Sequence, residues 1–137
     1  MDKTAAYYLT YLYRSFLAYT TKKLKTLGLN YGQLPFILYI GKCPRCTQAE
    51  LKNGLDVDWG HCQRSVDKLV MAGFAEKTQQ DGERVRLSLT PKGEQAFLLS
   101  HQVFDAWDRE HLQVLTPDER EQLLALLGKL TGDGKRI

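Results

Sequence analysis

The chain has 137 residues, the usual size of one domain or one compact subunit, and its 43% apolar content is sufficient for a hydrophobic core. Its net charge of +3 is only mildly basic, so a DNA-binding surface would need its cations sorted onto one face. No apolar run is long enough to cross a bilayer, and no secretion signal is evident. Together with an odd number of cysteines, three, these features predict a cytoplasmic protein without a disulfide scaffold.

Two helices are predicted at the start of the chain. The first covers about Thr4–Leu27 and is closed by Gly28, a residue typical of helix C-termini. Apolar residues recur along it at spacings of three and four, namely Tyr8, Leu9, Leu12, Phe16, Leu24 and Leu27. A second helix is expected over about Asn30–Ile40, with Gly41 as its end. Its first residue and Gln33 have the spacing of a reciprocal cap.

A helix-turn-helix pair is predicted in the middle of the chain. Thr47 and Glu50 repeat the reciprocal-cap spacing and start a short helix, Gln48–Leu55. The next helix, capped by Asp58 at its start, continues to about Ala72 and is stopped by the glycine that follows. Its predicted inward stripe consists of Val57, Cys62, Val66, Leu69 and Val70.

Between residues 74 and 90 the spacing of apolar residues changes to every second residue, which is typical of a strand. One side would carry Val85, Leu87 and Leu89, and the other Arg84, Arg86 and Ser88. The pair Asp81-Gly82 favours a two-residue turn between two strands. The segment is therefore predicted to be a β-hairpin with arginines on its outer side.

Two further helices are predicted at the C-terminal end. Thr90-Pro91 opens the first, whose apolar stripe comprises Ala96, Leu99, Val103 and Ala106. Thr116 and Glu119 form a capping box for the second, which runs to about Leu130. The whole order predicts a mainly α protein with a small β-hairpin wing, a winged helix-turn-helix. In such a fold the second helix of the pair fits the major groove of DNA, and the wing reaches the backbone or the minor groove.

Four segments in this order resemble the MarR family of bacterial and archaeal transcriptional regulators: L-G-L-N-Y-G-Q, T-Q-A-E-L, Q-R-S-V-D-K-L-V-M-A-G-F and D-G-E-R-V-R-L-S-L-T-P-K-G. The resemblance covers nearly the whole chain. It implies a homodimer, with residues 1–29 and 91–137 as dimerisation helices from both chain ends and residues 30–90 as the DNA-binding domain. It also implies a palindromic operator in double-stranded DNA and, often, a small aromatic effector that releases the DNA. On this basis the chain is interpreted as a sequence-specific repressor.

The resemblance also assigns positions within the DNA-binding region. Arg64 stands where the family has an arginine in its recognition helix, and Gln63 where the family often has Thr or Ser. Asp81 matches the wing aspartate, but Glu83 occupies the position of an arginine that enters the minor groove. Either Arg84 or Arg86 would then take that role. The candidate DNA contacts are Thr47, His61, Gln63, Arg64, Lys68, Arg84 and Arg86.

A ligand site is expected among aromatic residues. The first helix is rich in tyrosine, which suits both a dimer interface and a pocket for an aromatic ligand. Effectors of the family bind between the dimerisation helices and the winged domain, so Tyr11, Arg14 and Tyr39 are candidate contacts. Arg14 would supply the cation that an acidic effector needs.

The stretch G-K-C-P-R-C-T raises the possibility of thiol chemistry at Cys43 and Cys46. Cys46 lies at a helix start beside Arg45, and both features lower the pKa of a thiol. The alternative is a turn between two helices, with Cys46 as a small apolar residue. A zinc site needs about four ligands and only one cysteine pair is present, so neither a metal nor a cofactor is predicted.

No catalytic constellation emerges, because the chain lacks a phosphate-binding loop, a serine nucleophile motif and a metal-spaced set of histidines and carboxylates. An enzyme is therefore not predicted. Two alternatives to a ligand-controlled repressor stay open. One is a winged-helix protein-interaction module, or anti-repressor, suggested by Glu83 and by the nearly neutral middle segment. The other is a thiol-based redox-sensing regulator.

Overall fold

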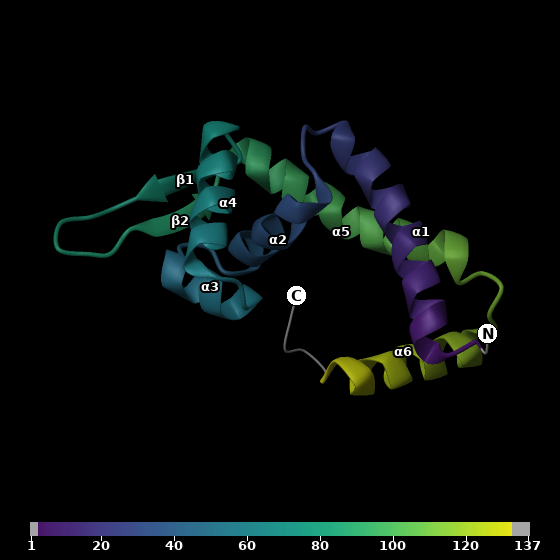
Figure 1. The fold of residues 1–137 in the computed structure, drawn as a ribbon. Coiled ribbons are helices and arrows are strands. Elements are labelled where there is room, and N and C mark those ends of the chain that lie inside the picture. The colour runs from purple at the N-terminus through teal and green to yellow at the C-terminus, as the bar shows by residue number, and fades with distance from the viewer. Residues whose placement is uncertain (1–2, 133–137) are drawn as a thin grey trace.

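The computed structural model describes residues 3–132 (Figure 1). Its elements follow the predicted order and confirm a mainly α fold with one antiparallel hairpin. They are α1 Ala5–Lys25, the 3₁₀ helix η1 Tyr31–Gln33, α2 Leu34–Lys42, α3 Gln48–Leu55, α4 Trp59–Met71, β1 Ala75–Thr78, β2 Arg86–Leu89, α5 Pro91–His111 and α6 Pro117–Thr131. None of the helices in this range combines the length and the apolar character needed to span a membrane.

Glycine ends α1 and α4 as predicted. After α1, the amide of Leu29 donates to the carbonyl of Leu24 at 3.1 Å across Gly28, which has a φ of 77°. After α4, the amide of Phe74 donates to the carbonyl of Leu69 at 2.9 Å across Gly73, with a φ of 82°. Both are the six-to-one bond of a helix ended by a left-handed residue, a conformation that favours glycine.

The second predicted helix differs from the observed one at both ends. The reciprocal cap between Asn30 and Gln33 is present, but it starts the 3₁₀ turn η1 that leads into α2. The prediction that Gly41 ends the helix is wrong, because α2 continues to Lys42. A Cβ atom at position 41 would collide with the ring of Phe97. Gly41 therefore lets α2 approach α5 closely.

The wing is a hairpin with a longer tip than the sequence predicted. The strands pair from Ala75–Leu89 to Thr78–Arg86, so residues 79–85 form a loop and Val85 is exposed. A turn is present at the predicted place, with the Glu83 amide donating to the Gln80 carbonyl at 3.0 Å. Of its two central residues, however, only Gly82 has a positive φ. The tight two-residue hairpin turn favoured by Asp-Gly requires a positive φ at both.

The linker between α2 and α3 forms a short antiparallel β-bridge with β2 of the wing, which the sequence did not predict. The Arg45 amide donates to the Leu87 carbonyl at 2.9 Å, and the Leu87 amide donates to the Cys46 carbonyl at 2.8 Å. Since Leu87 lies in β2 and Cys46 precedes α3, the wing and the helix-turn-helix are joined through the backbone.

The hydrophobic core surrounds α2. Phe36, Ile37 and Ile40 are almost completely buried, and α2 packs on α3, β2 and α5. Leu24 of α1 and Ala96 of α5 belong to the same core. The core therefore includes residues on both sides of the predicted boundaries between the DNA-binding region, residues 30–90, and the helices at the chain ends. Figure 1 shows α5 leading from the end of the wing to the crossing with α1, whereas α6 lies apart from the helix-turn-helix.

Candidate nucleic-acid interface

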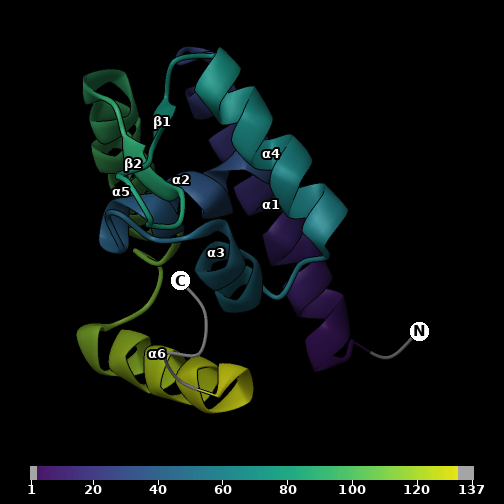
Figure 2. The same cartoon turned by 90° about the vertical axis from the view of Figure 1, so that its left-hand side faces the viewer.

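Helix α4 presents one polar face to solvent. Asp58 caps it by accepting a hydrogen bond from the His61 amide at 2.7 Å, which satisfies one of the free amides of the first turn. Cys62, Val66 and Leu69 are fully buried on the inner face. The remaining face carries His61, Gln63, Arg64 and Lys68, all exposed. Figure 2 shows α4 on the outer side of the structure, in front of α1.

His61 lies at the edge of this face. Its ring stacks on Phe36 of α2 with centroids 5.7 Å apart and an interplanar angle of 27°. This contact places one side of the imidazole against α2. The predicted contact of His61 with base edges or phosphates has less geometric support than that of Arg64.

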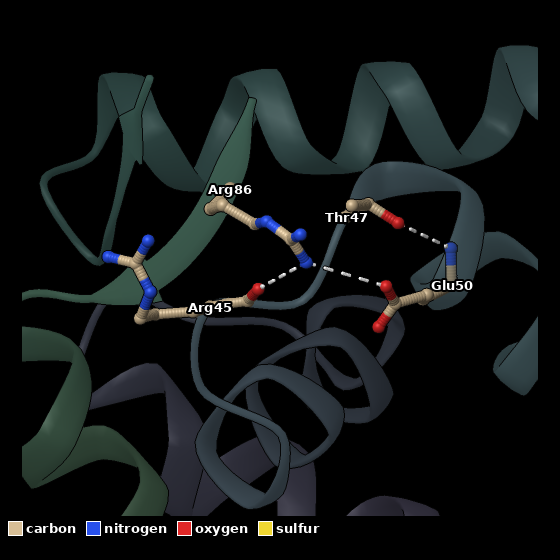
Figure 3. A network of polar contacts seen from close by, with 4 residues as sticks. All are labelled: Arg45, Thr47, Glu50 and Arg86. Atoms are coloured by element: carbon tan, nitrogen blue, oxygen red, sulfur yellow. Dashed lines mark hydrogen bonds and ion pairs between the residues drawn. The ribbon is translucent and has the colours of Figure 1, made fainter. Parts of the chain in front are cut away.

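Arg86, which the sequence places on the outer side of the hairpin, contacts the segment before α3 and the first turn of α3. One guanidinium nitrogen donates to the Arg45 carbonyl at 3.3 Å and lies 3.6 Å from Oε1 of Glu50 (Figure 3). Arg84, by contrast, is exposed in the loop at the wing tip. The alternation of apolar and polar residues could not distinguish Arg84 from Arg86, because Glu50, the partner of Arg86, lies 36 positions earlier in the sequence.

Thr47 has a structural role at the start of α3. Its side chain is 6% exposed, and its hydroxyl accepts a hydrogen bond from the Glu50 amide at 3.1 Å. The predicted reciprocal cap is incomplete, because the Glu50 carboxylate turns to Arg86 (Figure 3). A buried side chain is poorly placed for the direct DNA contact that was predicted. The exposed side chain beside it is Arg45, whose guanidinium points away from this network.

The three residues predicted to bind a ligand do not share one cavity within the protomer. Tyr11 and Arg14 lie on an open face of α1. The ring of Tyr39 lies instead against Gly54 of α3, where no Cβ would fit. Sequence reasoning missed a groove of about 370 Å³ beside His61, because its wall combines residues that are far apart in the sequence. It is lined by Tyr31, Gly32, Pro35, Phe36, Gly54, Leu55, Val57 and His61.

The cysteines do not form a low-pKa thiol pair. Burial, reinforced by the nearby Cys43 and Glu50, raises the pKa of Cys46 to about 11. The prediction that Arg45 and the helix start would lower this pKa is wrong, since the thiol is buried while the arginine side chain is exposed. Burial also raises the pKa of Cys62. Cys43 is exposed, and within residues 3–132 no three His, Cys, Asp or Glu side chains are placed to share a metal ion.

Comparison with known proteins places this architecture in a family. No protein-family model matches the chain. The HTH-type transcriptional regulator BilQ of Clostridium symbiosum is 39% identical over 132 residues, covering 95% of this chain and 92% of that protein. The reduced form of MarR from E. coli matches with a TM-score of 0.81 at 26% identity, covering 95% of this chain and 98% of that one. The chain belongs to the MarR family of DNA-binding transcriptional regulators.

A third MarR family protein shows the same fold in a complex. The regulator from Listeria monocytogenes, crystallised with 26mer DNA, matches with a TM-score of 0.79 at 22% identity. The match covers 96% of this chain and 89% of that one. The mainly helical arrangement with a two-stranded wing is therefore the MarR fold, and the relatives are regulators of transcription.

The thiols should differ in reactivity. With iodoacetamide at pH 7.5, Cys43 of the folded MarR family protein should be alkylated first, because it is exposed. A thiol of pKa about 11 has only roughly one thiolate in three thousand molecules at this pH, and Cys46 is also buried. Peptide mass spectrometry over time would measure the order, with the guanidinium-unfolded protein as the control in which all three react. Equal rates at Cys43 and Cys46 in the folded protein would contradict the assignment.

The Arg86 contacts should control the local stability of the wing. Arg86→Met keeps the aliphatic stem but removes the bonds to Arg45 and Glu50. Because the ion pair is partly exposed, we expect global stability to fall by only about 1 kcal/mol or less. Hydrogen exchange at the amides of Arg45 and Leu87 should become faster, since these amides close the bridge beside the lost contacts. Arg84→Met is the matched control, and equal exchange in both variants would argue against an internal anchor.

Proposed function

We propose that this protein is a repressor that binds a palindromic operator as a homodimer and is released by a small-molecule effector. The observation that carries the proposal is the outer face of α4, where Gln63, Arg64 and Lys68 are exposed above a fully buried inner face. A helix of this kind fits the major groove, where side chains distinguish all four base pairs. The DNA complex of the Listeria monocytogenes relative supports the same use of the fold here.

The proposed contacts divide by chemistry. Gln63 and Arg64 would meet base edges, because both can form paired hydrogen bonds in the major groove. Lys68, Arg84 and Arg45 would meet phosphates, which position the protein without reading sequence. Thr47, His61 and Arg86 would support the interface through the contacts described above.

Dimerisation is proposed through the helices at both ends of the chain, residues 1–29 and 91–137. An apolar groove of about 510 Å³ lies between α1, α5 and α6, and α6 buries no residue completely within the protomer. Its wall includes Leu9, Leu12, Leu124, Leu126 and Leu130, all of which are exposed. An apolar patch of this kind marks an interaction surface, and a second copy of the chain would cover it.

Release is proposed to occur through the groove beside His61. Its aromatic lining suits a flat aromatic ligand, and His61 connects it directly to α4. Two recognition helices must match half-sites about 34 Å apart, so a ligand that prefers another spacing would lower operator affinity. Tyr11, Arg14 and Tyr39 stay predictions as ligand contacts.

Operator binding is the test of this proposal. Fluorescence anisotropy would compare the DNA upstream of the protein's own gene with a scrambled duplex at several salt concentrations. A specific regulator should prefer the native duplex on the order of a thousandfold. Arg64→Ala should abolish this preference without changing the melting temperature, because the side chain is exposed. Arg109→Ala, an exposed arginine on α5, is the matched control.

Two outcomes would contradict the proposal. Equal and weak binding to both duplexes would argue against a reading role at this operator and favour the interaction-module alternative. A parallel loss of affinity and melting temperature in Arg64→Ala would show that Arg64 supports the fold and does not read DNA.

The dimer should depend on the apolar groove. Leu126→Asp with Leu130→Asp places two charges where a second copy would pack, so the dimer dissociation constant should rise at least roughly tenfold. Light scattering after size-exclusion chromatography would show a shift to monomer at low micromolar concentration. Leu98→Asp, equally exposed but outside the groove, should leave the dimer intact. A dimer that survives the double substitution would place the interface elsewhere.

A further inference from the structure

Gly60 leaves space on α4 that the Arg64 side chain uses. A Cβ atom at position 60 would lie 3.1 Å from a guanidinium nitrogen of Arg64 and 3.5 Å from Oδ1 of Asp58. Arg64 therefore folds back along the helix toward its N-terminal end. The backbone of Gly60 is helical, without the positive φ that would require glycine. Since glycine is a poor helix former, the position is better explained by this space than by local backbone geometry.

Asp58 supplies a fixed negative charge at the same place. Its Oδ1 accepts the His61 amide at 2.7 Å, which holds the carboxylate over the first turn of α4. This hydrogen bond and the nearby charge of Arg64 lower the pKa of Asp58, so the group is ionised at neutral pH. Both Asp58 and Arg64 lie within 3.5 Å of one point above Gly60. The two groups form no direct ion pair, so the carboxylate attracts the guanidinium through space toward the N-terminal end of the helix.

We propose that Asp58 and Gly60 position Arg64 as a preorganised reader of a guanine in each operator half-site. This inference rests on the proposed function and adds the positioning residues and the base that is read. A guanidinium has five donors in a planar fork, so one edge can face a carboxylate while another donates to O6 and N7 of guanine. A side chain held in advance loses less rotamer freedom on binding.

The consequence is selectivity more than general affinity. A freely moving Arg64 could still meet phosphates anywhere along a duplex, and such contacts carry no sequence information. Asp58 disfavours contacts between Arg64 and phosphates, because its negative charge repels a phosphate that approaches this end of α4. Loss of the Asp58 charge should therefore weaken binding to the operator and slightly strengthen binding to a scrambled duplex. Gly60→Ala should weaken binding to the operator alone, because it changes no charge.

Gly60→Ala is the direct test, carried out on the full-length protein. The added methyl group would lie 3.1 Å from a guanidinium nitrogen, which must shift by a few tenths of an ångström. We therefore expect operator affinity to fall a few-fold while affinity for a scrambled duplex stays the same. The melting temperature should stay equal or rise, since alanine is the better helix former. In an Arg64→Ala background, Gly60→Ala should have no further effect on affinity, because the group that it displaces is gone.

Asp58→Asn separates charge from capping. Asparagine caps a helix as well as aspartate does, so the fold should be retained while the attraction for Arg64 is lost. The expected result is a smaller fall in operator affinity, again only when Arg64 is present.

Replacing single guanines of the operator duplex by 7-deazaguanine removes N7 but keeps base pairing. One such replacement in each half-site should weaken the wild-type protein and have little effect on Gly60→Ala or Arg64→Ala.

The outcomes distinguish this inference from the proposed function. If Arg64→Ala keeps full selectivity, the reading role of α4 in the proposed function fails. If Arg64→Ala loses selectivity but Gly60→Ala keeps it, the positioning inference is overturned and the proposed function stands. A fall caused by Gly60→Ala that is equally large without Arg64 would also overturn it, because glycine would then serve a close approach of DNA to the backbone.

Discussion

The backbone contact between Phe74 and Gly93 determines how α4 is held. A Cβ atom at position 93 would collide with the Phe74 carbonyl oxygen, so the start of α5 lies directly against the segment that follows α4. At the same junction the Thr90 amide donates to the Phe74 carbonyl at 3.0 Å. Nζ of Lys92 donates to the Ala72 carbonyl at 2.8 Å. The end of α4 is thus fixed to α5, which crosses α1 at its other end (Figure 1). In the proposed dimer, a movement of α5 relative to the second copy would carry α4 with it.

Arg86 supports the base of the wing from inside the protein. The bridge between Cys46 and Leu87 connects the wing to the linker before α3, and Arg86 strengthens this connection through Glu50 (Figure 3). The helix-turn-helix and the base of the wing therefore form one unit. Only the loop over residues 79–85 extends beyond the strand pairing. The shape that DNA would meet is set by hydrogen bonds inside the protein, with adjustment confined to this tip.

Local signals in the sequence predicted the elements well, whereas contacts between distant segments were missed. The cap at Asp58 and the stop at Gly73 depend on residues a few positions away, so the chain order contains all that determines them. The role of Gly41 depends on Phe97, and that of Arg86 on Glu50. Whether Cys46 is reactive depends on burial that only the assembled core produces. At the candidate site, sequence alone identified the exposed face of α4 but not which side chains are already engaged elsewhere.

The charge balance of the interface favours selectivity over strong general attraction to DNA. Among the described residues, Lys77 pairs with Asp67 at 3.1 Å and Arg86 with Glu50, which removes two cations from the supply available to phosphates. Nonspecific affinity grows with the number of phosphates that a protein neutralises, so a surface with few available cations binds random DNA weakly. If the proposed function holds, the negative charges of Asp58 and Glu83 reduce the nonspecific affinity for DNA further. Tight binding then requires base contacts made by side chains that are already in place, which is the arrangement that α4 offers. Acidic residues at the start of α4 and at the wing tip are consequently compatible with the proposed function, because they weaken contacts with phosphates that no base contact accompanies.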